Sequence, residues 1–281
     1  MSAATVEAAL TGAAAPLVAE AVDAKTTTAD AAVTDGQAAV AIPRDPTDGV
    51  KVSLETTSIS INLPAVDQAS DAVALASGAI AYPSDNGVAN AVVPLDGGLQ
   101  LLTTISSPDA PTSFAYDITI SDGGQVVSAT DGSALVLSAR GEVLLRADAP
   151  WAVDANGTSV PTHYEVNGTR LVQVVDHNAD FAYPVVADPR FDQGVGWKSI
   201  LFNRWETRQI ASAGFIALGG AATACSVAGP AGVAACGLAA AAIGATATYA
   251  KDNGMCVGLS FWGIPPYMGW NPFVHSGRDC Y

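Results

Sequence analysis

The sequence predicts an α+β protein in which an antiparallel β-rich, sandwich-like domain precedes a disulfide-stapled αα-hairpin with an irregular aromatic tail. Three observations lead to this class. From about Val50 to Asp188, short β-type runs alternate with turns rich in Gly, Asp, Asn and Pro. The stretch from Ala213 to Ala250 has no charged residue and is typical of two helices built from small residues. All four cysteines follow the β-rich region.

Charge divides the chain near residue 196. The 281 residues carry a formal net charge of −15, of which residues 1–196 contribute −17 and residues 197–281 contribute +2. This break predicts an Ala/Thr-rich N-terminal segment (1–41, helix or linker), an acidic β-rich domain (42–196) and an Ala/Gly-rich helical hairpin with an aromatic tail (197–281). Nucleic acid is excluded as a partner, because phosphate binding needs clustered Lys and Arg.

The N-terminal segment favours one short helix. A helix from about Thr5 to Val22 is predicted, with Pro16 breaking or kinking it. Residues 23–37, rich in Ala, Thr and Asp, are expected to form a linker or a solvated face.

The clearest β signal is "THYEVNGTRLVQVVDH". It predicts a hairpin of strands Thr162–Val166 and Arg170–Asp176 around a type I′ turn at Asn167-Gly168, where both central residues need positive φ. Val185 and Val186 predict a further strand, and the prolines on either side of it indicate an edge or terminal position.

Helix signals follow. Asn203 and Glu206 stand three residues apart and predict a capping box, with a helix that begins at the next residue and continues to about Cys225. After a turn at "SVAGPAG", a second helix is expected to restart after Pro230, which suits a first turn, and to end at Asn253-Gly254. The remaining Gly/Pro-rich, aromatic segment is expected to be irregular and to cover one face of the hairpin.

The cysteines indicate two disulfides and an oxidising compartment. Three pairings are possible, and the spacing favours Cys225–Cys236 across a tight loop and Cys256–Cys280 near the end of the chain. Four reduced, buried cysteines are the alternative. Zinc is disfavoured because no C-x-x-C pair is present. The first residues lack the pattern of a signal peptide, so secretion would require a leader that is absent from this chain.

The uncharged stretch has two interpretations. Arg208 and Lys251 bracket 42 uncharged residues, enough for two helices that each span a bilayer core. Ala and Gly gain little from burial, however, so a packed, soluble hairpin that inserts conditionally is favoured over a permanent anchor. Four tryptophans flank the stretch and are candidates for membrane or partner contact, or fillers of a core poor in Leu: Trp197, Trp205, Trp262 and Trp270.

Signals for catalysis are weak. His163 and Glu165 would share one face of a strand, and with Asp176 or His177 they form the basis of a less favoured hydrolase hypothesis. The nucleophile elbow, the H-E-x-x-H pattern and the P-loop are all missing. The sequence therefore predicts no catalytic residues, no cofactor and no metal site, and it favours a protein that is not an enzyme.

The segment "APWAVDANGTSVPTHYEVNGTRLVQVVDHNADFAYPVVADPRF", followed by "NRWET", resembles a group of uncharacterised secreted proteins of actinobacteria. In that group an acidic β-rich part, closed by a "YPVVADP"-type segment, precedes a short, cysteine-containing Ala/Gly-rich region. The resemblance covers roughly residues 42–281 and is strongest at 149–207. It implies secretion and the two-part layout, and it implies no activity.

The expected function is that of a non-catalytic secreted or cell-envelope protein. Its C-terminal hairpin module would bind an envelope component or another partner, and in the sharpest form of the hypothesis it is membrane-active and bacteriocin-like. A structural or adhesive surface protein is the alternative.

Overall fold

The computed structural model describes residues 1–21, 25–26, 31–35, 38–54, 57–95, 98–129, 131–192, 198–213, 229–264, 267–276 and 280–281. Within these ranges, the backbone alone is described at 25–26, 31–35, 38, 198–200, 213, 229–239, 261–264 and 267–269.

The helices in these residues are α1 (Ala3–Thr11), α2 (Arg204–Ala213) and α4 (Gly229–Asp252), with short 3-10 helices at Pro46–Asp48 and Val66–Gln68. The strands are β1 (Lys25–Thr26), β2 (Ala31–Asp35), β3 (Ala38–Ile42), β4 (Val50–Leu54), β5 (Ser58–Asn62), β6 (Val73–Ala74), β7 (Ile80–Tyr82), β8 (Val88–Leu95), β9 (Gly98–Ile105), β10 (Ser113–Ile120), β11 (Gly124–Ser128), β12 (Ala134–Ser138), β13 (Val143–Ala147), β14 (Ala152–Val153), β15 (Thr162–Asn167), β16 (Arg170–Val175), β17 (Val185–Ala187), β18 (Arg190–Asp192), β19 (Lys198–Leu201), β20 (Cys256–Ile264) and β21 (Tyr267–His275).

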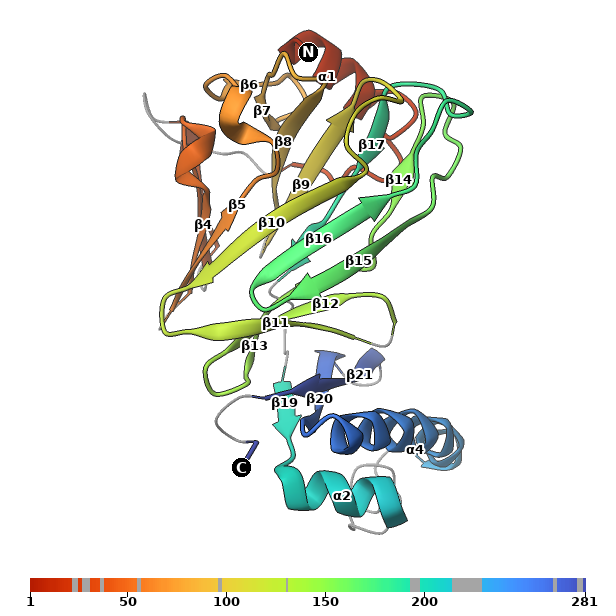
Figure 1. Ribbon diagram of the computed structural model, residues 1–281. Coiled ribbons are helices and arrows are strands. Elements are labelled where there is room, and N and C mark those ends of the chain that lie inside the picture. Colours follow the sequence, from red (N-terminus) through yellow and green to blue (C-terminus); the bar gives the residue numbers. More distant parts are fainter. Residues whose placement is uncertain are drawn as a thin grey trace.

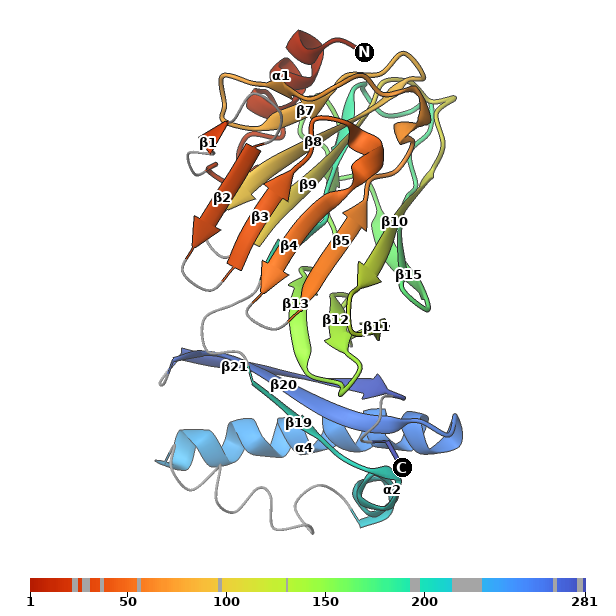
Figure 2. The same ribbon diagram turned by 90° about the vertical axis from the view of Figure 1, so that its left-hand side faces the viewer.

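Two antiparallel sheets form the β-rich part, as the sequence predicted (Figures 1 and 2). One has the strand order β1-β2-β3-β4-β5-β10-β16-β15 and the other β11-β12-β13-β18-β9-β8-β7-β6, with β17 paired to both β14 and β9. The main core draws buried side chains from both sheets, for example Ile59 of β5, Tyr116 of β10 and Leu101 of β9. In β10 buried residues alternate with more exposed ones, which is the pattern of a strand with one face on a core.

The N-terminal segment is part of this fold. Helix α1 ends at Thr11, well before the predicted break at Pro16, and Ser2 caps its start by accepting a hydrogen bond from Thr5 N. Val6 and Leu10 of α1 pack against alanines of β8 on the outer face of the second sheet. The stretch 23–37 was predicted to be a linker or a solvated face. Instead it contains β1 and β2, and β2 joins the first sheet by pairing with β3.

The 162–175 hairpin is confirmed, but the predicted type I′ turn is wrong. Asn167 pairs with Arg170, so the two-residue loop is Gly168-Thr169. Gly168 has φ +65°, whereas neither Asn167 nor Thr169 has positive φ. A single glycine of positive φ at the first central position is the requirement of a type II′ turn, in which Asn167 can remain an extended strand residue.

The predicted start of the first helix and end of the second are confirmed. The predicted continuation of the first helix to about Cys225 lies outside the described residues, so the αα-hairpin itself is not shown. Glu206 N donates to Asn203 Oδ1 (2.9 Å) and Asn203 N donates to Glu206 Oε2 (2.8 Å), which is the reciprocal capping box. Helix α4 carries Pro230 in its first turn. It ends in a Schellman motif, in which Gly254 has φ +68° and Met255 N donates to Ala250 O (2.8 Å). Helices α2 and α4 pack against each other, and their connection lies outside the described residues.

The prediction of an irregular aromatic tail is wrong. β20 and β21 pair from Cys256↔His275 to Ile264↔Tyr267, and β19 pairs with the other side of β20. β21 is the edge of this three-stranded sheet, and an edge strand tolerates a proline such as Pro272, whose missing N–H is not needed for the ladder. Gly258, Gly263, Gly269 and Pro272 are therefore sheet residues.

The three-stranded sheet separates the helices from the β-rich part (Figure 2). On one face, Val257 and Leu259 of β20 pack against Ile210 of α2 and Ile243 of α4. On the other face, Phe273 of β21 is 1% exposed and packs against side chains of β11 and β12. A β-bridge between Ala129 and Phe273, and a hydrogen bond from Ser276 Oγ to Gln125 Oε1 (3.0 Å), complete this contact.

Candidate functional site

The predicted disulfide between Cys256 and Cys280 is present. It joins the first residue of β20 to the segment that follows β21. The next residue, Tyr281, accepts a hydrogen bond at its backbone oxygen from Arg204 N at the start of α2 (3.2 Å). The disulfide therefore fastens residues 280–281 beside the first turn of α2. The predicted partner pair is not described: Cys225 lies outside the described residues, and so does the side chain of Cys236 in α4.

Three large aromatic residues of the C-terminal part have exposed side chains. Trp205 of α2 is 62% exposed, Tyr249 of α4 is 58% exposed and Tyr281 is 80% exposed. Tyr281 lies beside α2 through its hydrogen bond to Arg204. Tyr249 stands in the last turns of α4, the helix that leads into Cys256, the disulfide partner of Cys280. We call these three residues the aromatic end.

The other predicted tryptophans do not join this group. Trp270 of β21 is half-buried and packs on the core between the helices and the sheet, so it fills the core. Trp262 belongs to β20 by its backbone, but its side chain lies outside the described residues, as does all of Trp197. Of the four candidates for membrane or partner contact, Trp205 is the one that the structure shows at the surface.

One face of α2 is cationic as well as aromatic. Arg204, Trp205, Arg208 and Ser212 are exposed, whereas Thr207 and Ile210 are completely buried. At about 100° per residue, the four exposed positions fall within an arc of roughly 100°, opposite the buried pair. Thr207 fixes this orientation, because its Oγ1 accepts a hydrogen bond from Val257 N of β20 (3.1 Å).

The residues of the hydrolase hypothesis lie on an open surface or are already engaged. His163 Nε2 is 3.8 Å from Glu165 Oε1 on β15, so the two share a face as predicted, but their side chains are 57% and 68% exposed. Asp176 is also exposed. His177 is buried, and its two ring nitrogens are each 2.9 Å from a partner, Tyr183 Oη and Pro111 O. The arrangement does not surround a substrate.

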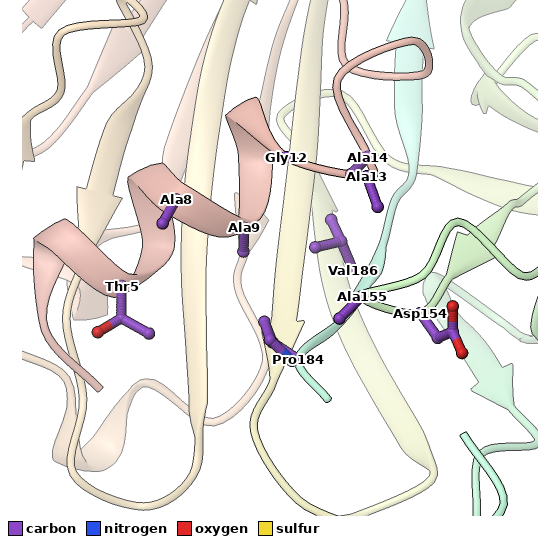
Figure 3. A pocket seen from close by; sticks show the side chains of 10 residues that line it. All are labelled: Thr5, Ala8, Ala9, Gly12, Ala13, Ala14, Asp154, Ala155, Pro184 and Val186. Carbon is purple, nitrogen blue, oxygen red and sulfur yellow. The ribbon is translucent and has the colours of Figure 1, made fainter. Parts of the chain in front are cut away.

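A pocket of about 200 Å³ lies between α1 and the segment around β17 (Figure 3). Half of its ten lining residues are alanines, and none of the histidines contributes to it. Its carboxylate, Asp154, accepts hydrogen bonds from the backbone N–H groups of Asn156, Thr158 and Ala182. With its oxygens committed to these loop amides, Asp154 acts as a structural group that shapes the turn.

Sequence analysis missed a buried carboxyl group, Asp188. This residue is 1% exposed and accepts hydrogen bonds from Trp151 N (3.1 Å) and Gln100 Nε2 (3.3 Å). Burial raises the pKa of Asp188 to about 7, against the lowering effect of the two hydrogen bonds. The same Gln100 side chain accepts from Ala19 N (2.8 Å), so it connects the carboxyl group to the N-terminal segment.

Among the described residues, no group of three or more His, Cys, Asp or Glu side chains could hold a metal ion. In the same part of the chain, no helix combines the length and the apolarity that crossing a membrane requires.

Comparison of the sequence with models of known protein families finds no match. Comparison with curated protein sequences finds no match either.

Proposed function

We propose that this protein is a non-catalytic, secreted or cell-envelope protein whose β-rich part holds a C-terminal αα-hairpin module against an envelope partner. The observation that carries the proposal is the aromatic end, where Trp205, Tyr249 and Tyr281 expose most of their side chains. Exposed large apolar residues that lie near one another mark interaction surfaces, and Trp205 and Tyr281 both lie at the first turn of α2. The resemblance to secreted actinobacterial proteins and the Cys256–Cys280 disulfide favour an extracellular setting.

The contact around Phe273 supports the role of the β-rich part as a holder. The strand β21 is seated on β11 and β12, and its apolar face is covered there. The module is consequently left with its helical side, which carries the aromatic end, as the side available to a partner.

The test is retention of the purified full chain on actinobacterial cell envelopes. The double variant Trp205→Ala, Tyr281→Ala should lower retention by about ten-fold or more, because the variant loses most of the apolar area that a partner would cover. The matched control is Val73→Ala on β6, which removes an exposed apolar side chain from the β-rich part and should leave retention unchanged.

Retention that is equal in the wild type, the double variant and the control would overturn the proposal. A catalytic role would replace it if the purified chain hydrolysed envelope material and the substitution His163→Ala abolished that hydrolysis.

A further inference from the structure

We infer that the aromatic end and the exposed face of α2 bind the phosphate groups of an anionic lipid surface. The inference rests on the proposed function and names the partner for the same surface.

Two arginines, Arg204 and Arg208, give the exposed face of α2 its positive charge. They are four residues apart on α2, so they project from the same face of the helix. Both are exposed, and neither forms an ion pair with a carboxylate among the described residues. The nearest acidic residue along the helix, Glu206, is engaged by Asn203 N in the capping box. Within the described part of the chain, these two guanidinium groups have no carboxylate partner, so they are available to phosphates.

The exposed aromatic side chains of this surface carry polar atoms. Trp and Tyr each join an apolar ring to an N–H or O–H group, and such residues favour the boundary between water and hydrocarbon. At the aromatic end, Trp205 stands next to Arg204 on α2, and Tyr281 is hydrogen-bonded to the backbone of Arg204. Rings and cations thus occupy one surface, which suits the headgroup region of a bilayer better than its interior.

The three-stranded sheet sets the orientation of α2 relative to the acidic β-rich part. The helices and the acidic β-rich part contact opposite faces of the three-stranded sheet, because Val257 and Phe273 belong to opposite faces. A membrane that contacts α2 therefore meets the side with the arginines first. Residues 1–196 carry a net charge of −17, and the β-rich part that they form lies, as far as the structure describes it, on the far side of that sheet.

The experiment measures co-sedimentation of the full chain with two kinds of vesicle, one of phosphatidylcholine alone and one of phosphatidylcholine mixed equally with phosphatidylglycerol. The chain is expected to bind the mixed vesicles, and its binding to the neutral vesicles should be at least ten-fold weaker.

Each of Arg204→Gln and Arg208→Gln should reduce binding about five-fold. Trp205→Ala should reduce it about ten-fold, and Trp205→Tyr should restore most of the loss. The control is Arg44→Gln, an exposed arginine of the β-rich part, which should change nothing.

The outcomes separate the inference from the proposed function. If the chain binds cell envelopes but neither kind of vesicle, the proposed function survives and the lipid inference fails. Binding to envelopes from which lipid has been extracted would identify an anionic wall polymer and would also overturn the inference. Failure to bind envelopes or vesicles overturns both. Dye leakage from the mixed vesicles, if it accompanies binding, identifies insertion beyond the headgroups.

Discussion

At the scale of single residues, Asp188 shows how a fold assigns a property that its sequence neighbourhood does not reveal. "ADPRF" looks like the end of a strand and a turn. The burial of the carboxyl group depends on Gln100, which is 88 residues away, and on Trp151. Short-range patterns contain no information about such contacts, so neither the burial nor the raised pKa of Asp188 could be predicted from the sequence.

The raised pKa has a consequence for stability. A carboxyl group whose pKa is about 7 in the folded protein and 3.8 in the unfolded chain keeps its proton longer in the folded state. Its contribution to the free energy of unfolding is complete below about pH 4 and is lost as the pH rises to about 7, by at most about 4 kcal/mol. Asp188→Asn removes this titration, so stability relative to wild type should rise between pH 4 and pH 8.

The measurement is urea unfolding of wild type and variant at several pH values, with Asp176→Asn as the control at an exposed aspartate. Parallel stability curves for wild type and Asp188→Asn would show that the carboxyl group titrates normally and would contradict the assignment.

Replacing glycine by alanine should change the free energy of unfolding in opposite directions at Gly168 and Gly244. Gly168 has φ +65° and an ideal Cβ there meets no atom within 4 Å, so Gly168→Ala should cost about 1 kcal/mol through backbone conformation alone. Gly244 lies inside α4, also with open space at its Cβ, and Gly244→Ala should stabilise by up to about 1 kcal/mol. Both values follow from chemical unfolding. A Gly168→Ala variant as stable as wild type would exclude the type II′ turn.

At the scale of elements, local signals predicted helix ends better than they predicted strands. Asn203 with Glu206, Pro230 and Asn253-Gly254 marked real helix boundaries, because caps act within one turn of the helix. The strands β20 and β21 were missed, because their glycines and prolines look like breakers until the edge position of β21 and the ring of Phe273 over Gly258 are known. Both features depend on contacts between residues that are far apart in the sequence.

The contact between β20 and β21 gives a sharp test. A Cβ at Gly258 would lie 2.4 Å from Cζ of Phe273, whose ring is completely enclosed by β11 and β12. Gly258→Ala should therefore destabilise the protein by about 1–3 kcal/mol, because the ring has no room to move. Chemical unfolding measures the cost.

The same substitution in a Phe273→Ala background provides the control. Without the ring, the added methyl group meets no obstacle from this partner, and most of the cost of Gly258→Ala should disappear. An equal cost in both backgrounds would show that strain elsewhere is responsible and that the ring does not cover Gly258.

At the scale of the whole molecule, the division of charge between the two parts was visible in the sequence, but its spatial consequence was not. The predicted boundary near residue 196 separates −17 from +2. Only the structure adds that β21 is seated on β11 and β12, so that the cationic face of α2 belongs to the opposite side of the intervening sheet. Charge composition alone predicts repulsion from every anionic surface, whereas this arrangement predicts attraction from one side.

This arrangement predicts an unusual salt dependence for binding to the phosphatidylglycerol vesicles. At about 0.01 M salt the Debye length is about 30 Å, so the acidic part still repels the anionic lipid surface and opposes binding. At about 0.1 M it is about 10 Å, which screens the distant acids more than the nearby arginines, and binding should be strongest. At about 1 M the attraction of Arg204 and Arg208 is screened as well. Co-sedimentation across this series should therefore show a maximum, and the double variant Arg204→Gln, Arg208→Gln should lose it.

A steady decline from the lowest salt would mean that the acidic part does not oppose binding, and the orientation inferred for the bound molecule would be wrong.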